Sequence, residues 1–185
     1  MKNILMILTS HATMDHTDST TGVWLGEVTD PYYEFLDAGY TITLASVAGG
    51  RPPIDPLSTL TENITSSNRR FNEDPAARSA FTTTFPLSTI DSDVFDAVFY
   101  PGGHGPLWDL AANIHSGQLI LDFIKAGKPV AAVCHGPAAL IKAAELQPGF
   151  LSGKRITGFT NIEETLTLRA DNIPYKLETR LKESG

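Results

Sequence analysis

The stretch "KPVAAVCHGPAAL", residues 128–140, holds the single cysteine of the chain, Cys134, between an apolar run and a helix-forming run. The residues before Cys134 have the length and composition of a strand that is buried on both faces. Small residues flank the cysteine, with Ala132 two positions before it and Gly136 two positions after it. A sharp strand-to-helix turn that presents a nucleophile needs small neighbours at these positions. We therefore predict a nucleophile elbow at Cys134.

A single cysteine is more often a small buried hydrophobic residue than a nucleophile. Cys134 departs from that pattern because it precedes a predicted helix, whose amide N–H groups and dipole stabilise a thiolate. We therefore expect a reactive thiol with a lowered pKa that is readily oxidised. His135 follows directly and is a candidate general acid/base, because imidazole titrates near neutrality. Its alternative role is to cap the helix or to line the rim of the site.

Strand-like and helix-like runs alternate along the chain, which predicts a parallel sheet covered by helices on both faces. Residues 51–80 are punctuated by prolines and are interpreted as a loop with one short helix. Residues 1–185 are thus expected to form one doubly wound α/β domain. The predicted strands are 2–9, 40–47, 95–103, 128–134 and 155–159, and the predicted helices are 27–38, 118–126, 138–144 and 175–182.

The composition is that of an ordinary globular protein, with 42% hydrophobic and 19% charged residues among 185. A net charge of −7 disfavours binding to the phosphates of nucleic acids. We expect no membrane partner, because no apolar run approaches the length of a membrane span. One cysteine excludes an internal disulfide framework and fits a reducing compartment, so we expect a cytoplasmic protein.

Several polar features are predicted to meet at one rim of the sheet, because ligands of such sheets bind outside the carboxyl ends of the strands. Gly102 and Gly103 follow a buried strand, and their N–H groups suit an oxyanion hole together with that of His135. Glu163 and Glu164 follow the last predicted strand and are candidate carboxylate partners for His135. Their alternative role is a favourable interaction with a helix dipole.

His11, Asp15 and His16 could supply metal ligands, but a polar loop explains these residues better, and we expect no metal site. A glutamine amidotransferase would need a histidine late in the chain. The histidines are at positions 11, 16, 104, 115 and 135, and only His135 follows Cys134. This excludes the amidotransferase interpretation.

Four motifs together resemble the ThiJ/PfpI superfamily, and most closely its branch of glyoxalase and heat-shock-protein-thirty-one-like chaperone proteins. The motifs are "YPGGHGPLWDL" at 100–110, "KPVAAVCHGPAAL" at 128–140, "ITGFTNIEET" at 156–165, and residues 21–58. The resemblance implies a flavodoxin-like sandwich with a strained cysteine elbow. Members of the family continue through a further strand and helix, which residues 1–185 are expected to lack. We expect the exposed sheet edge to promote a homodimer.

The resemblance also implies roles for individual residues. The glutamate that hydrogen-bonds the thiol falls on Glu27, four residues before Pro31. The family histidine falls on His135, and its carboxylate partner falls on Glu164, with Glu163 as the alternative. The oxyanion site falls on Gly102 and Gly103, and His104 is expected to line the mouth.

The activity attributed to this family is the glyoxalase III reaction, a cofactor-free conversion of methylglyoxal to D-lactate. The cysteine would add to the aldehyde, a proton would move from C1 to C2 through an enediol, and the thioester would be hydrolysed. Protein deglycase and holdase chaperone activities are attributed to relatives, and proteolysis to some. The expected partner is therefore a small 2-oxoaldehyde. The alternative outside enzymology is a stress holdase or redox sensor that uses oxidation of Cys134.

Overall fold

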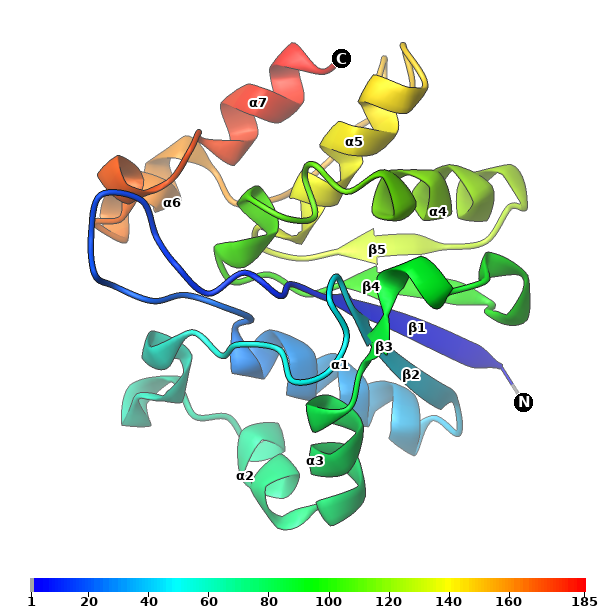
Figure 1. Ribbon diagram of the computed structural model, residues 1–185, viewed down its shortest axis with the longest axis vertical. Helices are drawn as coiled ribbons and strands as arrows, with labels where there is room; N and C mark the ends of the chain where they lie inside the picture. Colours follow the sequence, from blue (N-terminus) through cyan, green and yellow to red (C-terminus); the bar gives the residue numbers. More distant parts are fainter. Residues whose placement is uncertain (1) are drawn as a thin grey trace.

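A computed structural model describes residues 2–185, which form a parallel five-stranded sheet (Figure 1). The strand order is β3-β2-β1-β4-β5, and every neighbouring pair is parallel. This arrangement confirms the predicted doubly wound α/β fold. The strands are β1 (Asn3–Leu8), β2 (Thr41–Ser46), β3 (Phe85–Pro86), β4 (Ala97–Tyr100) and β5 (Val130–Ala132).

Helices cover both faces of the sheet (Figure 1). On one side lie α1 (Leu25–Asp37), α2 (Ser66–Glu73) and α3 (Pro75–Thr82), and on the other lie α4 (Ile114–Lys125) and α5 (Ala139–Leu146). The short helix α6 (Asn161–Leu166) lies near the carboxyl ends of the strands, and α7 (Leu177–Glu183) lies beside α5. Within residues 2–185, no helix is both long and apolar enough to cross a membrane.

The side chains of the central strand β1 pack into hydrophobic cores on both faces of the sheet. These side chains alternate between the two cores, as the pleat of a strand requires. Leu5 and Ile7 join the core beneath α4 and α5, while Ile4, Met6 and Leu8 join the core beneath α1, α2 and α3. A third cluster, which includes Ile141 of α5 and Leu177 of α7, holds the C-terminal helix in place.

Two sequence predictions of secondary structure were wrong. Residues 51–80 contain the whole of α2 and the start of α3, because Thr65 and Asp74 each cap a helix with their side chains. Residues 155–159 form no strand, since Phe159 alone bonds back to the end of the sheet, through its N–H to the Cys134 carbonyl. The strand β5 therefore remains at the edge of the sheet.

The sheet topology places the candidate residues together. Successive strands are added on one side of β1 as far as β3, and then on its other side from β4 onward, so the strand order reverses between β1 and β4. These two strands are neighbours in the sheet although they are far apart in sequence. A crevice at such a switch point is the usual ligand site of an open α/β sheet. Thr9 follows β1, Gly102 follows β4, and Cys134 follows β5, all at the carboxyl ends of the strands.

The elbow itself provides a test of this packing. A Cβ atom on Gly136 would lie 2.2 Å from the backbone oxygen of Tyr100, so the Gly136→Ala variant must move the end of β4. We expect a loss of about 1–3 kcal/mol in the free energy of unfolding. Chemical denaturation measures it, with Gly26→Ala in α1 as control, since its Cβ meets nothing closer than 3.4 Å. Equal stability of the two variants would contradict the tight elbow.

Candidate active site

Cys134 occupies a strained turn between β5 and the first turn of the following helix. Its φ is 57°, in the left-handed region that a residue with a side chain adopts at a cost of about 1–2 kcal/mol. Gly102 packs directly against this turn, because a Cβ on Gly102 would lie 2.6 Å from the Cβ of Cys134. The strand-to-helix elbow predicted from the small flanking residues is therefore present, and Cys134 is partly exposed on it.

Glu27 lies beside the thiol, although it comes from α1, more than 100 residues earlier in the chain. Its Oε2 accepts a hydrogen bond of 2.8 Å from the N–H of Gly102, and its carboxyl group also hydrogen-bonds Cys134. Burial raises the pKa of Glu27 from 4.5 to about 7, although the bonds with Cys134 and Gly102 lower it in part. This carboxyl group is therefore poised to give and take a proton near neutrality.

The expectation of a low pKa for Cys134 was wrong. Burial of the sulfur raises the pKa of the Cys134 thiol well above its usual value, and the neighbouring charge of Glu27 raises it further. The N–H groups of Gly103 and His135 face the sulfur and offset only part of this effect. The thiol therefore keeps its proton at rest, and its reaction requires a nearby proton acceptor.

His135 also lies beside the thiol. Its Nδ1 lies 3.3 Å from the Cys134 Sγ, and its Nε2 lies 2.7 Å from Oε2 of Glu164. Burial lowers the pKa of His135 to about 4, so the imidazole is neutral at pH 7. We assign its proton to Nε2, which donates to the carboxylate, and this leaves a lone pair on Nδ1 toward the thiol.

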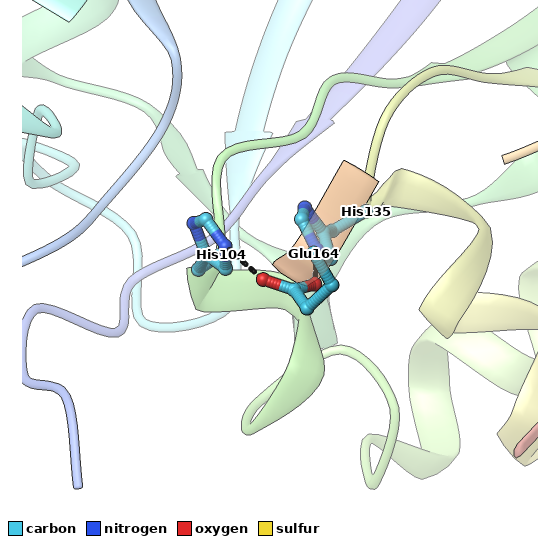
Figure 2. A group of neighbouring side chains, drawn as sticks. All are labelled: His104, His135 and Glu164. Atoms are coloured by element: carbon cyan, nitrogen blue, oxygen red, sulfur yellow. Dashed lines mark hydrogen bonds and ion pairs between the residues drawn. The ribbon is translucent and has the colours of Figure 1, made fainter. Parts of the chain in front are cut away.

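The carboxylate partner of His135 is Glu164, not Glu163. Glu164 comes from α6 and accepts hydrogen bonds from both His135 and His104 (Figure 2). Burial opposes its ionisation, but the two histidine bonds outweigh it and lower the pKa of Glu164 to about 2. Glu163 instead bonds the N–H and hydroxyl of Thr160 in a capping box at the start of α6.

His104 and Gly102 do not stand where we expected them. His104 does not line the mouth: it is 5% exposed, and its ring lies 4.2 Å from that of His135, centroid to centroid. Its Nε2 lies 2.9 Å from Oε1 of Glu164 and forms a hydrogen bond with it (Figure 2). The N–H of Gly102 already serves Glu27, so the amides of Gly103 and His135 are the ones that face the sulfur.

Three further residues of this network, Arg169, Asp55 and Thr21, were missed from sequence. Arg169 lies within 3.3 Å of Nδ1 of His104 and forms an ion pair of 2.6 Å with the fully buried Asp55. The same carboxylate also accepts hydrogen bonds from the hydroxyl of Thr21 and the N–H of Leu57. The available signal was an acidic residue inside a proline-rich segment, and its spacing from position 169 follows no recognisable pattern.

The buried trio His104, His135 and Glu164 has the residue types of a metal site, with ligand atoms within 4.8 Å of one another. Its atoms are already joined by hydrogen bonds, and a metal ion would have to displace both N–H protons beside the Arg169 cation. We therefore interpret these three residues as a hydrogen-bonded network. In the N-terminal loop, the ring of His11 stacks on Trp108, and Asp15 accepts a hydrogen bond from the indole N–H of Trp108. His11 and Asp15 therefore hold the side chain of Trp108 in place.

The α/β sandwich, with a carboxyl group and an imidazole beside a cysteine elbow, has the fold and the site that the resemblance of the four sequence motifs implies. The chain is a member of the DJ-1/PfpI family, whose sequence pattern matches residues 19–176. This confirms the family predicted from sequence.

Three individual proteins and structures show which members of the family are similar to this chain. The chain is 30% identical to Glyoxalase 3 of Candida albicans over 171 residues, which is 90% of this chain and 72% of that protein. The structure of the Rapid Encystment Protein of 24 kDa from Francisella tularensis matches with a TM-score of 0.94 and 35% identity, covering 100% of this chain and 82% of that one. The structure of glyoxalase III from Candida albicans matches with a TM-score of 0.83 and 26% identity, covering 99% and 80%.

The raised pKa of Glu27 predicts a specific pH dependence of stability. Between pH 4.5 and about 7 the folded chain binds the Glu27 proton more tightly than the unfolded chain, so this contribution to stability is lost as the pH rises. The Glu27→Gln variant has no such proton to lose. The free energy of unfolding of this variant, relative to that of the parent, should therefore rise by about 1–3 kcal/mol between pH 4.5 and pH 8.

Urea unfolding at several pH values measures this difference. The matched control is Glu163→Gln, because hydrogen bonds with Thr160 lower the pKa of Glu163. Its contribution to stability therefore changes with pH only below the ordinary value of 4.5, and this variant should run parallel to the parent between pH 4.5 and pH 8. A Glu27→Gln variant whose stability runs parallel to the parent at every pH would contradict the raised pKa.

Proposed function

We propose that this protein is a glutathione-independent glyoxalase that converts methylglyoxal to D-lactate through a covalent adduct on Cys134. The observation that carries the proposal is the pair of proton carriers around one thiol: a carboxyl group with a pKa of about 7 and a neutral imidazole whose Nδ1 faces the sulfur. The names of the relatives support the same reaction class, since Glyoxalase 3 and glyoxalase III align with nearly the whole of this chain.

The reaction begins with transfer of the thiol proton to Nδ1 of His135, while the sulfur forms a bond to the aldehyde carbon C1. His135 returns this proton to the resulting alkoxide, which gives a hemithioacetal. Glu27 then removes the hydrogen on C1 as a proton, and the electron pair forms an enediolate with its negative charge on the C2 oxygen. The same carboxyl group delivers this proton to C2, and the hydroxyl proton on the C1 oxygen moves to the C2 oxygen. The product is a thioester in which C1 has been oxidised and C2 reduced, so no external oxidant or cofactor is needed.

Hydrolysis completes the cycle. A water molecule adds to the thioester carbonyl and the C–S bond breaks, which releases lactate and restores the thiol. The negative charge on the carbonyl oxygen is expected to be stabilised by backbone N–H groups at the elbow, with Gly103 and His135 the best placed donors and Gly102 occupied by Glu27. Glu164 keeps His135 oriented in each step through its 2.7 Å hydrogen bond.

The alternative role, a holdase or redox sensor, does not require this set of buried groups. A redox sensor needs an accessible thiolate, whereas burial and Glu27 hold the proton on Cys134. The geometry therefore favours turnover. We also propose a cytoplasmic location, since a reducing compartment keeps the single cysteine in the thiol form that the reaction needs.

The decisive variants are Glu27→Ala and Glu27→Gln. Both should lower the rate of D-lactate formation from methylglyoxal by about a hundredfold or more, the usual scale for a lost general acid/base. Cys134→Ala should abolish it, and Glu163→Gln should retain the parent rate, because Glu163 only caps α6. If the Glu27 variants match the parent, Glu27 does not carry the proton. If the parent forms no D-lactate, the proposed function is wrong.

We also propose that the protein is a homodimer that covers the edge of β5. Val133 is 37% exposed beside this edge, and Ile162 and Leu166, one turn apart on α6, are 74% and 75% exposed. A cavity of about 510 Å³ lies nearby, between residues 151–160 and α7.

Sedimentation equilibrium at micromolar concentration should give a dimer of the 20.0 kDa chain. The Leu166→Lys variant should shift it toward monomer, because a cation would enter the apolar contact. A parent protein that sediments as a monomer would overturn this proposal.

A further inference from the structure

Behind the reacting groups, Arg169 connects three segments that are distant in sequence. Its Nη1 donates to Oδ2 of Asp55 at 2.6 Å, and its Nη2 donates to Oδ1 at 3.3 Å. The same Nη1 lies 3.3 Å from Nδ1 of His104. The side chains involved are nearly inaccessible, with 13% exposure for Arg169, 7% for His104 and none for Asp55.

The contact with Arg169 determines which nitrogen of His104 carries a proton. A guanidinium group has only donors, so the Nδ1 atom that faces it must present a lone pair. The proton of a neutral His104 ring therefore resides on Nε2, where it is donated to Oε1 of Glu164. The opposite tautomer would set two donors against each other at Arg169 and leave Glu164 with one bond fewer.

The groups that surround His104 fit this tautomer. They are the Arg169 guanidinium at Nδ1, the Glu164 carboxylate at Nε2 and the neighbouring ring of His135, while Asp55 is already engaged by Arg169 and Thr21. Phe159 packs 6.1 Å from His104, centroid to centroid, and contributes no charge. A proton on Nδ1 would set an N–H donor against the guanidinium donors of Arg169 in a buried environment, which is costly.

The state of His104 passes to the thiol through Glu164. When Nε2–H of His104 donates to Oε1, the other oxygen of Glu164 remains a full acceptor for Nε2–H of His135. That bond keeps the lone pair of His135 on Nδ1, toward Cys134. With the ring proton on Nδ1 instead, a lone pair of His104 would face Oε1 of Glu164, and the repulsion between them would weaken the hydrogen bond of Glu164 with His135.

We propose that Arg169 is a positioning residue, which fixes the tautomer of His104 and thereby keeps Nδ1 of His135 free to accept the Cys134 proton. Asp55 serves this arrangement by holding the guanidinium group with a two-point ion pair. The consequence for turnover rests on the proposed glyoxalase function, whereas the effect on the histidine rings does not.

The test replaces Arg169 by Met, which has similar length but no donor. Arg169→Met alone leaves the buried carboxylate of Asp55 without its ion-pair partner, which could unfold the protein. The double variant Asp55→Asn/Arg169→Met also removes that charge and therefore serves as a second test that is less destabilising. Arg180→Met is the matched control, because Arg180 is 44% exposed and forms only long ion pairs. Nitrogen NMR of protein labelled in histidine reports the protonation of each ring nitrogen, and steady-state kinetics with methylglyoxal report turnover.

In the parent and in Arg180→Met, the neutral His104 ring should carry its proton on Nε2. In both Arg169 variants, part of the neutral His104 rings should carry the proton on Nδ1 instead, because no donor then faces that nitrogen. The kcat should fall by about tenfold or more with a KM within about twofold of the parent. Arg169→Lys, which keeps a cationic donor, should recover part of the loss.

Arg169 variants that keep the proton of the neutral His104 ring on Nε2 alone would overturn the proposal, as would variants whose kcat equals that of the parent. If the parent shows no turnover of methylglyoxal, the proposed function fails but the NMR result still decides this inference. A shift of the ring proton in the Arg169 variants then supports it, and an unchanged ring contradicts it.

Discussion

The withdrawal of ionisable groups from water at the carboxyl end of the sheet is the constraint on which this site depends. Burial raises the pKa of Glu27 to about 7, keeps the proton on Cys134, and lowers the pKa of His135 to about 4. In water, the same three side chains would be a carboxylate, a thiol and a partly charged imidazole. Only the buried arrangement places a protonatable acid and a neutral base on two sides of one sulfur.

The fold supplies this arrangement through backbone geometry. The left-handed turn at Cys134 requires Gly136 and Gly102 to lie so close that neither tolerates a Cβ without movement. The N–H of Gly102 at this close approach donates a hydrogen bond of 2.8 Å to Glu27. The strain of the elbow, the position of the acid and the burial of the thiol therefore have one common cause, the meeting of β4 and β5 with the start of α1.

Much of this could be predicted from the sequence, because local patterns report local structure. The buried strands, the elbow and the family motifs indicated the doubly wound fold and brought Cys134, His135, Glu27 and Glu164 into one group. The pKa of Cys134 was predicted in the wrong direction, since a helix N-terminus can be read from sequence whereas depth of burial cannot. His104 and Arg169 were misplaced or missed for a related reason: their roles arise from hydrogen bonds across 60 or more residues, which no short pattern encodes. The absent strand at 155–159 reflects the same limit, because a strand forms only where a neighbour pairs with it.

The central claim is that Glu27 titrates near neutrality beside the thiol. Carbon NMR of protein labelled at the glutamate side-chain carboxyl carbon measures this directly, with the Glu27 signal identified by its loss in Glu27→Gln. Glu27 should show a titration midpoint near pH 7 in the protein without substrate. A midpoint near 4.5, the ordinary value for glutamate, would mean that Glu27 is a permanent carboxylate and would contradict the proposed proton transfer.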